Sequence, residues 1–103
     1  HCSIEQPTPE MTSFVEAYKK RFNGKTPDAM AVLGYDSALV LADAMKRAGT
    51  TDGPALRDAI AATKNFSGAS GVISLNENRD AVKALVFIQI KGGKFTYSAT
   101  VNP

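Results

Sequence analysis

The sequence predicts an α/β fold in which three helices come first and strands follow. Three observations support this prediction. Apolar residues recur at helical spacing in the first two thirds of the chain, beside residues that favour helix starts. The run ALVFIQI at 84–90 is apolar on both faces at first, as in a central strand. Lys91-Gly92-Gly93-Lys94 then has the glycines of a hairpin turn, and residues 95–101 alternate between apolar and polar side chains.

The first helix is predicted over about residues 9–23. Thr8 can cap its start through the hydroxyl group, and Pro9 suits the first helical position. Asn23-Gly24 is a typical helix end. The residues expected on its apolar face are Met11, Phe14, Val15, Tyr18 and Phe22.

The next segment is the most apolar part of the chain. Residues 29–33 predict a short buried strand, and residues 34–48 predict a second helix that ends at Gly49. Asp43 and Arg47 are one helical turn apart and can form an ion pair. One apolar face of this helix would carry Tyr35, Ala38, Leu39, Ala42 and Met45, another would carry Val40, Leu41 and Ala44, and a thin polar stripe would carry Asp36, Asp43 and Arg47.

A third helix is predicted over about residues 53–64, after Asp52 and with Pro54 in its first turn. From Phe66 onward glycines and the segment VISL predict a strand, and NENRD at 76–80 predicts a turn. These elements leave more apolar surface than the chain can cover. The residues alone leave two alternatives open: a segment of a larger or self-associating protein, and a complete small α+β domain.

Several functions find little support in the composition. The net charge of +2 is small and evenly spread, which argues against a nucleic-acid partner. His1 and Cys2 lack the further groups that a catalytic or zinc site needs, so we expect no enzyme activity, no metal and no cofactor. NENRD resembles a calcium loop only at its start, because Ala81 and Phe87 occupy the positions that need Gly and Glu.

The order of the motifs resembles the C-terminal part of the branched-chain amino acid binding proteins. The stretches that carry the resemblance are AYKKRFNGKTPDAMAVLGYDSALVLADAMKRAG, PALRDAIAATKNFSGASG, VISLNENRD and VFIQIKGGKF. These proteins are type I periplasmic solute-binding components of ABC importers. The resemblance covers about the whole chain. One departure is Arg79, which stands where the family pattern has a Gly, and we expect a positive φ at this position.

The resemblance implies a two-lobed fold of which this chain is a C-terminal fragment. Residues 1–7 would leave the hinge, and residues 8–75 would belong to the N-terminal lobe. Residues 76–103 would form a crossover strand and a β-hairpin that reach the other lobe. Absent parts of the protein would then cover the helix at 34–48.

The implied function is the binding of an amino acid or related small molecule and its delivery to an ABC permease. The location would be periplasmic, or extracytoplasmic and lipid-anchored in a Gram-positive cell. Met30 and Tyr35 are the candidate ligand-binding residues, because the resemblance places them near the ligand edge. Packing is the alternative role for each, with equal weight for Met30 and greater weight for Tyr35. The rival functions are a ligand-sensing domain of the same fold and a small self-associating α+β module. The chain alone is expected to self-associate.

Overall fold

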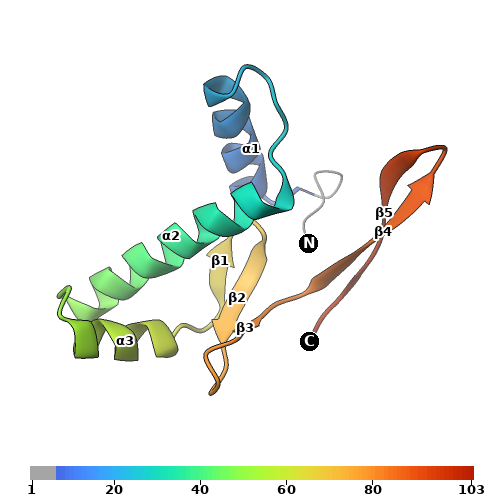
Figure 1. Cartoon of the computed structure of the whole chain (residues 1–103). Coiled ribbons are helices and arrows are strands. Elements are labelled where there is room, and N and C mark those ends of the chain that lie inside the picture. The colour runs from blue at the N-terminus through green and yellow to red at the C-terminus, as the bar shows by residue number, and fades with distance from the viewer. Residues whose placement is uncertain (1–6) are drawn as a thin grey trace.

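The computed structural model describes residues 7–103 (Figure 1). The helices and strands, in chain order, are α1 (Pro9–Arg21), α2 (Ala29–Ala48), α3 (Gly53–Ala61), β1 (Phe66–Gly68), β2 (Gly71–Leu75), β3 (Ala81–Val82), β4 (Leu85–Lys91) and β5 (Lys94–Val101). The strands form two separate antiparallel sheets in this part of the chain, one with the order β1-β2-β3 and one with β4-β5. The mixed helix and strand content confirms the predicted α/β class.

The helix α1 begins as its sequence predicts. The Thr8 hydroxyl accepts a hydrogen bond from the backbone N–H of Met11 at 3.2 Å, and Pro9 is the first helical residue. The helix ends at Arg21, two residues before the expected end, and Asn23 and Gly24 follow with positive φ angles. The buried residues Met11 and Phe14 of α1 form a small core with Val32 and Ala69.

The predicted strand at 29–33 is wrong, because these residues form the first turns of α2. Asp28 caps the helix: its Oδ1 accepts a hydrogen bond from the backbone N–H of Ala31 at 2.8 Å. The apolar residues that suggested a strand are compatible with a helix, and the capping bond gives the backbone a helical start. Gly34, the expected first residue of this helix, therefore lies within it.

The buried face of α2 also differs from the expected one. Its buried residues are Val32, Asp36 and Ala44, which follow a spacing close to one helical turn. Tyr35 and Ala38, expected to be covered, are exposed, and Asp36, expected on a polar stripe, is 2% exposed. The reason is that the β1–β2 hairpin packs over the Asp36 side of the helix and supplies hydrogen-bond donors to its carboxylate.

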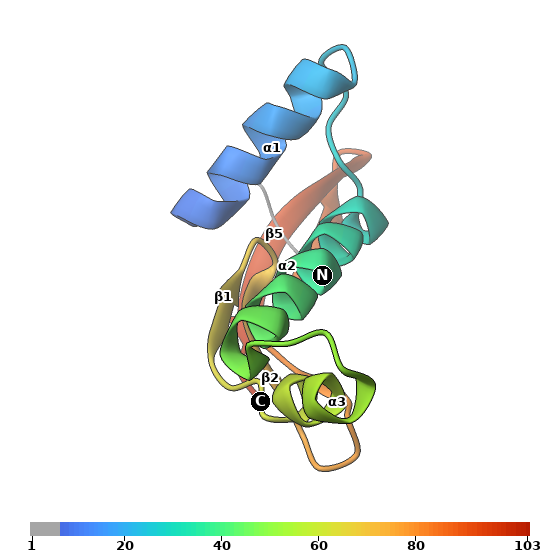
Figure 2. The ribbon, with the colours of Figure 1, turned by 90° about the vertical axis from the view of Figure 1, so that its left-hand side faces the viewer.

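Arg47 joins the C-terminal part of α2 to α3. Its Nε lies 2.8 Å from Oδ2 of Asp43, which confirms the predicted ion pair. The same guanidinium donates to the carbonyl oxygen of Ala59 at 2.7 Å and to the hydroxyl of the buried Thr63 at 3.1 Å. The helix α3 ends at Ala61, three residues earlier than expected. In Figure 2, α1 lies near the start of α2 and α3 lies beside its end.

The turn at 76–80 connects β2 to β3 and confirms the expectation for Arg79. Arg79 has a φ of 70°, in the left-handed region that favours glycine. The Asn76 side-chain oxygen accepts hydrogen bonds from the backbone N–H groups of Asn78 and Asp80, both at 2.9 Å. The side chain of Asn76 therefore stabilises the turn by accepting hydrogen bonds from the backbone of the residues that follow it, as Asn commonly does in turns.

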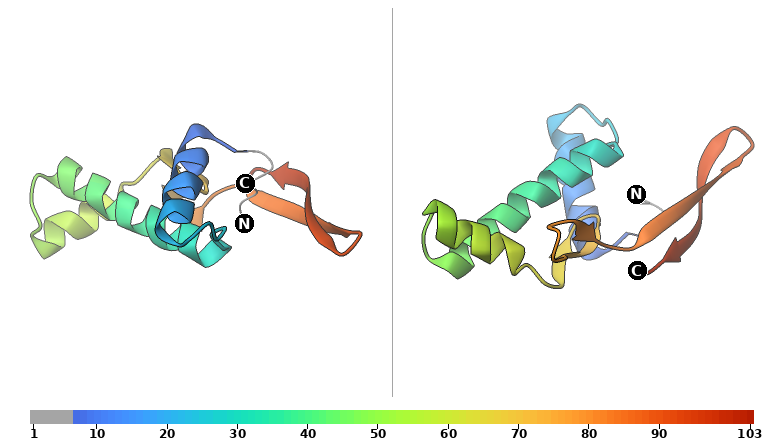
Figure 3. Two further views of the ribbon diagram at one scale, coloured as in Figure 1. Left: turned by 90° about the horizontal axis from the view of Figure 1, so that it is seen from above. Right: turned by 60° about the horizontal axis from the view of Figure 1, so that its bottom comes forward.

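The hairpin turn between β4 and β5 is confirmed, with Gly92 at φ 54° and Gly93 at φ 75°. The expectation that residues 84–90 form a central strand is wrong for the described chain, because β4 pairs with β5 alone. Leu85, Phe87 and Ile90 are each more than half exposed. The hairpin projects away from the helices in both views of Figure 3.

The overall shape argues against a complete compact domain. The molecule measures 50 × 32 × 19 Å and has a radius of gyration of 15.3 Å. A compact domain of this length is expected to have a radius near 13 Å. The buried apolar residues among those described are Met11, Phe14, Val32, Ala44, Ala69 and Ile73. The extended shape and the small core favour the fragment alternative.

The positive φ of Arg79 leads to the first prediction. Replacing Arg79 with Gly should stabilise the fold by up to about 1 kcal/mol, because Gly has no Cβ to clash in the left-handed region. Urea denaturation of the two chains measures the difference. Asn78→Gly is the matched control in the same turn, because Asn78 is not among the positive-φ residues. A lower midpoint for Arg79→Gly would contradict the prediction.

Candidate functional site

The two predicted ligand-binding residues lie near the start of α2. Met30 is the second residue of the helix, and its side chain is 75% exposed. Tyr35 follows five residues later, so the two side chains leave the helix about 140° apart. The structure thus places both in the first half of α2 but does not bring them onto one face.

Tyr35 is held by an aromatic contact with α1. Its ring centroid lies 4.6 Å from that of Phe14, with the rings tilted by 35°. Phe14 in turn contacts Tyr18, which contacts Phe22. One side of the Tyr35 ring therefore packs in the protein, while 40% of the residue remains exposed. Met30 has the more open position of the two.

A buried carboxylate, which sequence reasoning missed, lies next to this region. Asp36 Oδ1 accepts a hydrogen bond from the backbone N–H of Ala69 at 2.7 Å. Its Oδ2 accepts one from the backbone N–H of Ser70 at 2.8 Å and a short one from the Ser70 hydroxyl. Ala69 and Ser70 form the tip between β1 and β2. Asp36 therefore fixes the tip of this hairpin against α2.

Glycine makes this close approach possible and is the signal that could have revealed it. A Cβ atom on Gly68 would lie 2.8 Å from the carboxyl carbon of Asp36, a separation that real Cβ atoms do not show. Gly71, on the other side of the tip, has a φ of 124°. An acidic residue inside an apolar helix, together with a later Gly-x-x-Gly stretch, was the available pattern.

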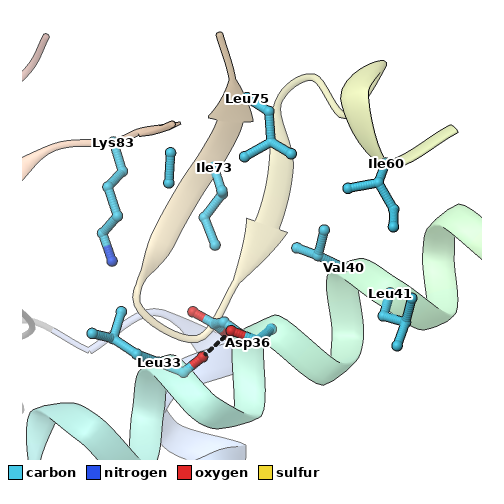
Figure 4. Close-up of a pocket in the computed structure, with 10 residues that line it drawn as sticks. Leu33, Asp36, Val40, Leu41, Ile60, Ile73, Leu75 and Lys83 are labelled. Atoms are coloured by element: carbon cyan, nitrogen blue, oxygen red, sulfur yellow. Dashed lines mark hydrogen bonds between the residues drawn. The ribbon is translucent and has the colours of Figure 1, made fainter. Parts of the chain in front are cut away.

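An apolar groove lies between α2, α3 and the β1–β2–β3 sheet (Figure 4). It has a volume of about 430 Å³. Its lining residues are Leu33, Asp36, Ser37, Val40, Leu41, Ile60, Ile73, Leu75, Ala81 and Lys83. Ligand pockets usually combine apolar walls with several polar groups that converge on one point. Because the Asp36 carboxylate is already occupied by the hairpin tip, this groove has the character of a packing surface.

The β4–β5 hairpin carries two apolar surfaces. Cross-strand partners share a face, so Ile88, Tyr97, Ile90 and Phe95 lie together near the turn. We call these four residues the tip face. The opposite face at the same level carries Gln89 and Thr96, whereas Leu85, Phe87 and Val101 make it apolar near the open end. Two residues of the tip face are largely exposed, Ile90 at 69% and Phe95 at 79%.

Within residues 7–103, no group of three or more His, Cys, Asp or Glu side chains is placed to hold a metal ion. Within the same residues, no helix has the length and apolar character needed to cross a membrane. His1 and Cys2 lie outside the described residues.

The fold and the order of the motifs are those of a class of solute-binding proteins. The family model for periplasmic binding proteins matches residues 3–94, which is most of the chain. The chain therefore belongs to the periplasmic binding protein family. The comparison with curated proteins gives no match.

Solved structures of the same family show the likeness in three dimensions. A leucine-binding protein from Thermotoga maritima is 43% identical, with a TM-score of 0.81 over 93% of this chain. A branched-chain amino acid substrate-binding protein from Streptococcus pneumoniae, solved with isoleucine, is 28% identical, with a TM-score of 0.83 over 98% of this chain. A solute-binding protein from R. palustris, solved with benzoate, is 24% identical with a TM-score of 0.75 over 93% of this chain, which shows the fold alone.

These relatives are several times longer than the chain. The chain spans 27% of the Thermotoga protein and 28% of the Streptococcus protein. The matched segment is thus a fragment of a type I periplasmic binding protein fold, as the sequence predicts. The exposed apolar side chains of Leu41, Ile90 and Phe95 are those expected of a fragment.

The Asp36 cluster leads to the second prediction. Asp36→Ala should lower the free energy of unfolding by about 3 kcal/mol, because it leaves two backbone N–H groups and a hydroxyl without their acceptor. Asp43→Ala is the control, since Asp43 lies in the same helix and forms an ion pair at the surface. Asp43→Ala should lower the free energy of unfolding by about 1 kcal/mol or less.

Urea denaturation measures both variants. Gly68→Ala tests the same contact from the other side, because its Cβ would collide with the carboxylate. Equal effects of Asp36→Ala and Asp43→Ala would show that the buried cluster does not anchor the hairpin tip.

Proposed function

We propose that this chain is part of an extracytoplasmic protein that binds an amino acid or a related small molecule for ABC-type import. The observation that carries the proposal is the 43% identity to a leucine-binding protein over 93% of the chain, with a TM-score of 0.81. The relative solved with isoleucine agrees with it. The partner in import would be a membrane permease, and the location would be periplasmic or, in a Gram-positive cell, at the outer face of the membrane.

The proposed division of the chain follows the two parts of the structure. The helices and the β1–β2–β3 sheet would belong to the N-terminal lobe, and β4 and β5 would reach the C-terminal lobe. The apolar groove supports this division, because Val40 and Leu41 of α2 and Ile60 of α3 line an open hollow beside the small sheet. In α/β proteins such a surface is covered by a further layer of secondary structure.

Met30 is the stronger candidate for ligand contact in this proposal. Its exposed position in the first turn of α2 leaves the flexible side chain free to pack against an apolar ligand. Tyr35 would contribute through its hydroxyl, because one side of its ring is occupied by Phe14. Other ligand contacts would come from parts of the protein outside this chain.

The extended shape of the molecule argues against one of the rival functions. A small self-sufficient module would need a compact core, whereas the radius of gyration is 15.3 Å. A ligand-sensing domain would have the same fold as a transport protein. Solute binding is the chemistry that these two functions share, and the experiment below tests it directly.

The third prediction concerns ligand binding. In a chimera, these 103 residues replace the matching segment of the Thermotoga maritima leucine-binding protein. We expect the chimera to bind leucine with a Kd of about 10 μM or lower, measured by calorimetric titration. The isolated chain should show no saturable binding of leucine, valine or phenylalanine, because most of the cleft is missing.

Variants of the chimera test the two candidate residues. Met30→Ala should raise the Kd about tenfold, since it removes the burial of one Met side chain. Tyr35→Phe should raise it about threefold, through the loss of one hydrogen bond. Met45→Ala, near the other end of α2, is the matched control and should leave the Kd unchanged. A folded chimera that binds no leucine, or micromolar binding by the isolated chain, would count against the proposal.

The fourth prediction concerns the chain by itself. Because the tip face and α2 expose apolar side chains, the isolated chain should form a dimer or larger assembly. Light scattering measures its mass. Phe95→Lys, on the tip face, should shift the assembly toward monomer, whereas Thr96→Lys, on the opposite face, should have a smaller effect. A monodisperse monomer of 10.9 kDa with a cooperative melt would refute the prediction.

A further inference from the structure

Two residues connect the helical part of the molecule to the hairpin. The strand β3 ends at Val82 and pairs with β2, so it belongs to the helical part. The strand β4 begins at Leu85 and pairs with β5. Lys83 and Ala84 lie between them. Any change in the direction of the hairpin relative to the helices must therefore arise in or beside this two-residue link (Figure 1).

The first residue of the link is tied to α2 through a chain of hydrogen bonds. The Lys83 ammonium donates to the Ser70 hydroxyl at 2.6 Å. The Ser70 hydroxyl donates to Asp36, whose carboxylate is 2% exposed. A cation and a carboxylate thus share one hydroxyl group in a partly buried position. Such charge-assisted hydrogen bonds are stronger than neutral ones and are screened less by salt than exposed pairs.

The aliphatic part of Lys83 is also held by packing. Lys83 lines the apolar groove together with Ile73 and Leu33, and in Figure 4 its side chain runs beside Ile73 toward the Asp36 region. Lys83 also lines a second, smaller hollow with Val82 and Pro103. The side chain is half-buried. Lys83 therefore has a defined position, whereas Ala84 has no side-chain group that could form a comparable bond.

From these contacts we infer that Lys83 is a positioning residue that clamps the link to the helical part, so that the hairpin pivots at Ala84 and Leu85. The inference rests on the proposed function, in which the hairpin belongs to the second lobe. The clamp then sets the angle between the lobes before ligand arrives. A protein whose lobes already hold a defined angle loses less freedom on binding and binds more tightly.

The test uses the leucine-binding chimera with one fluorescent dye on each lobe. Lys83→Met removes the ammonium and keeps an apolar stem. Ser70→Ala removes the shared hydroxyl and leaves the backbone N–H bonds to Asp36 in place. Lys83→Arg is the conservative replacement. Lys64→Met is the matched control, because Lys64 donates one hydrogen bond of 3.0 Å to the Leu75 carbonyl, within the helical part.

We expect Lys83→Met and Ser70→Ala to broaden the distribution of distances between the dyes without ligand. Both should raise the leucine Kd about threefold to tenfold, which is less than the full loss of a hydrogen bond to a charged group, because Lys83 acts on the lobe angle and not on the ligand itself. Lys83→Arg should restore most of the affinity and the narrow distribution. Lys64→Met should match the unmodified chimera in both measurements, even if its thermal midpoint falls.

The inference is overturned if Lys83→Met leaves the distance distribution unchanged and the Kd within twofold. It is also overturned if Lys64→Met broadens the distribution as much as Lys83→Met, or if neither Lys83→Met nor Ser70→Ala folds, since the network would then serve stability alone. If the unmodified chimera folds but binds no leucine, the proposed function fails. The distance distributions still decide the role of Lys83 in that case.

Discussion

The carboxylate of Asp36 is the group on which three separate parts of the chain converge. It belongs to α2, it accepts both backbone N–H groups at the tip of the β1–β2 hairpin, and through Ser70 it reaches the link that follows β3. A buried carboxylate is stable only when its lone pairs are satisfied, so these bonds must form together. This one group therefore bonds the hairpin tip to α2 directly and the link to α2 through Ser70.

The rest of the structure shows why such an anchor matters here. The apolar core is small, and the groove and the tip face leave large side chains uncovered. Hydrophobic burial within the described residues is therefore modest, and directional hydrogen bonds have a large share in fixing how the elements sit. Arg47 has the same role at the other end of α2, where it joins Asp43, Ala59 and Thr63. Two polar clusters thus hold α2 at two points along its length.

The membership of the chain in the periplasmic binding protein family gives these features a common explanation. The chain spans 27% of its Thermotoga relative, so much of the surface that is apolar here would face other parts of a whole protein. The two parts of the structure, helical body and hairpin, are joined by Lys83 and Ala84 alone in chain order. We expect such a fragment to keep the hydrogen bonds within its helical body and to expose the apolar side chains that other parts of a whole protein would cover.

Local sequence signals determined the start of α1 at Thr8, the end of α2 at Gly49, the turn with Arg79 at a positive φ and the two-glycine hairpin. Each of these depends on residues close in the chain, as does the Asp43–Arg47 pair. The order of motifs also identified the family and the α/β class. The error at 29–33 arose because a short apolar run is compatible with a strand and with a helix, and Asp28 decided between them by capping the helix.

Only the tertiary structure decided which face of α2 is buried and what Asp36 does. Its donors lie 33 and 34 residues further along the chain, and helical periodicity contains no information about so distant a partner. Asp36 was expected on a polar stripe because acidic side chains are usually solvated. The apolar sequence of β4 likewise did not predict its exposure, because a strand is central only when other strands pair with it on both sides. The sequence by itself thus specified the elements and the family, and the contacts between distant residues specified the anchor, the groove and the link at Lys83.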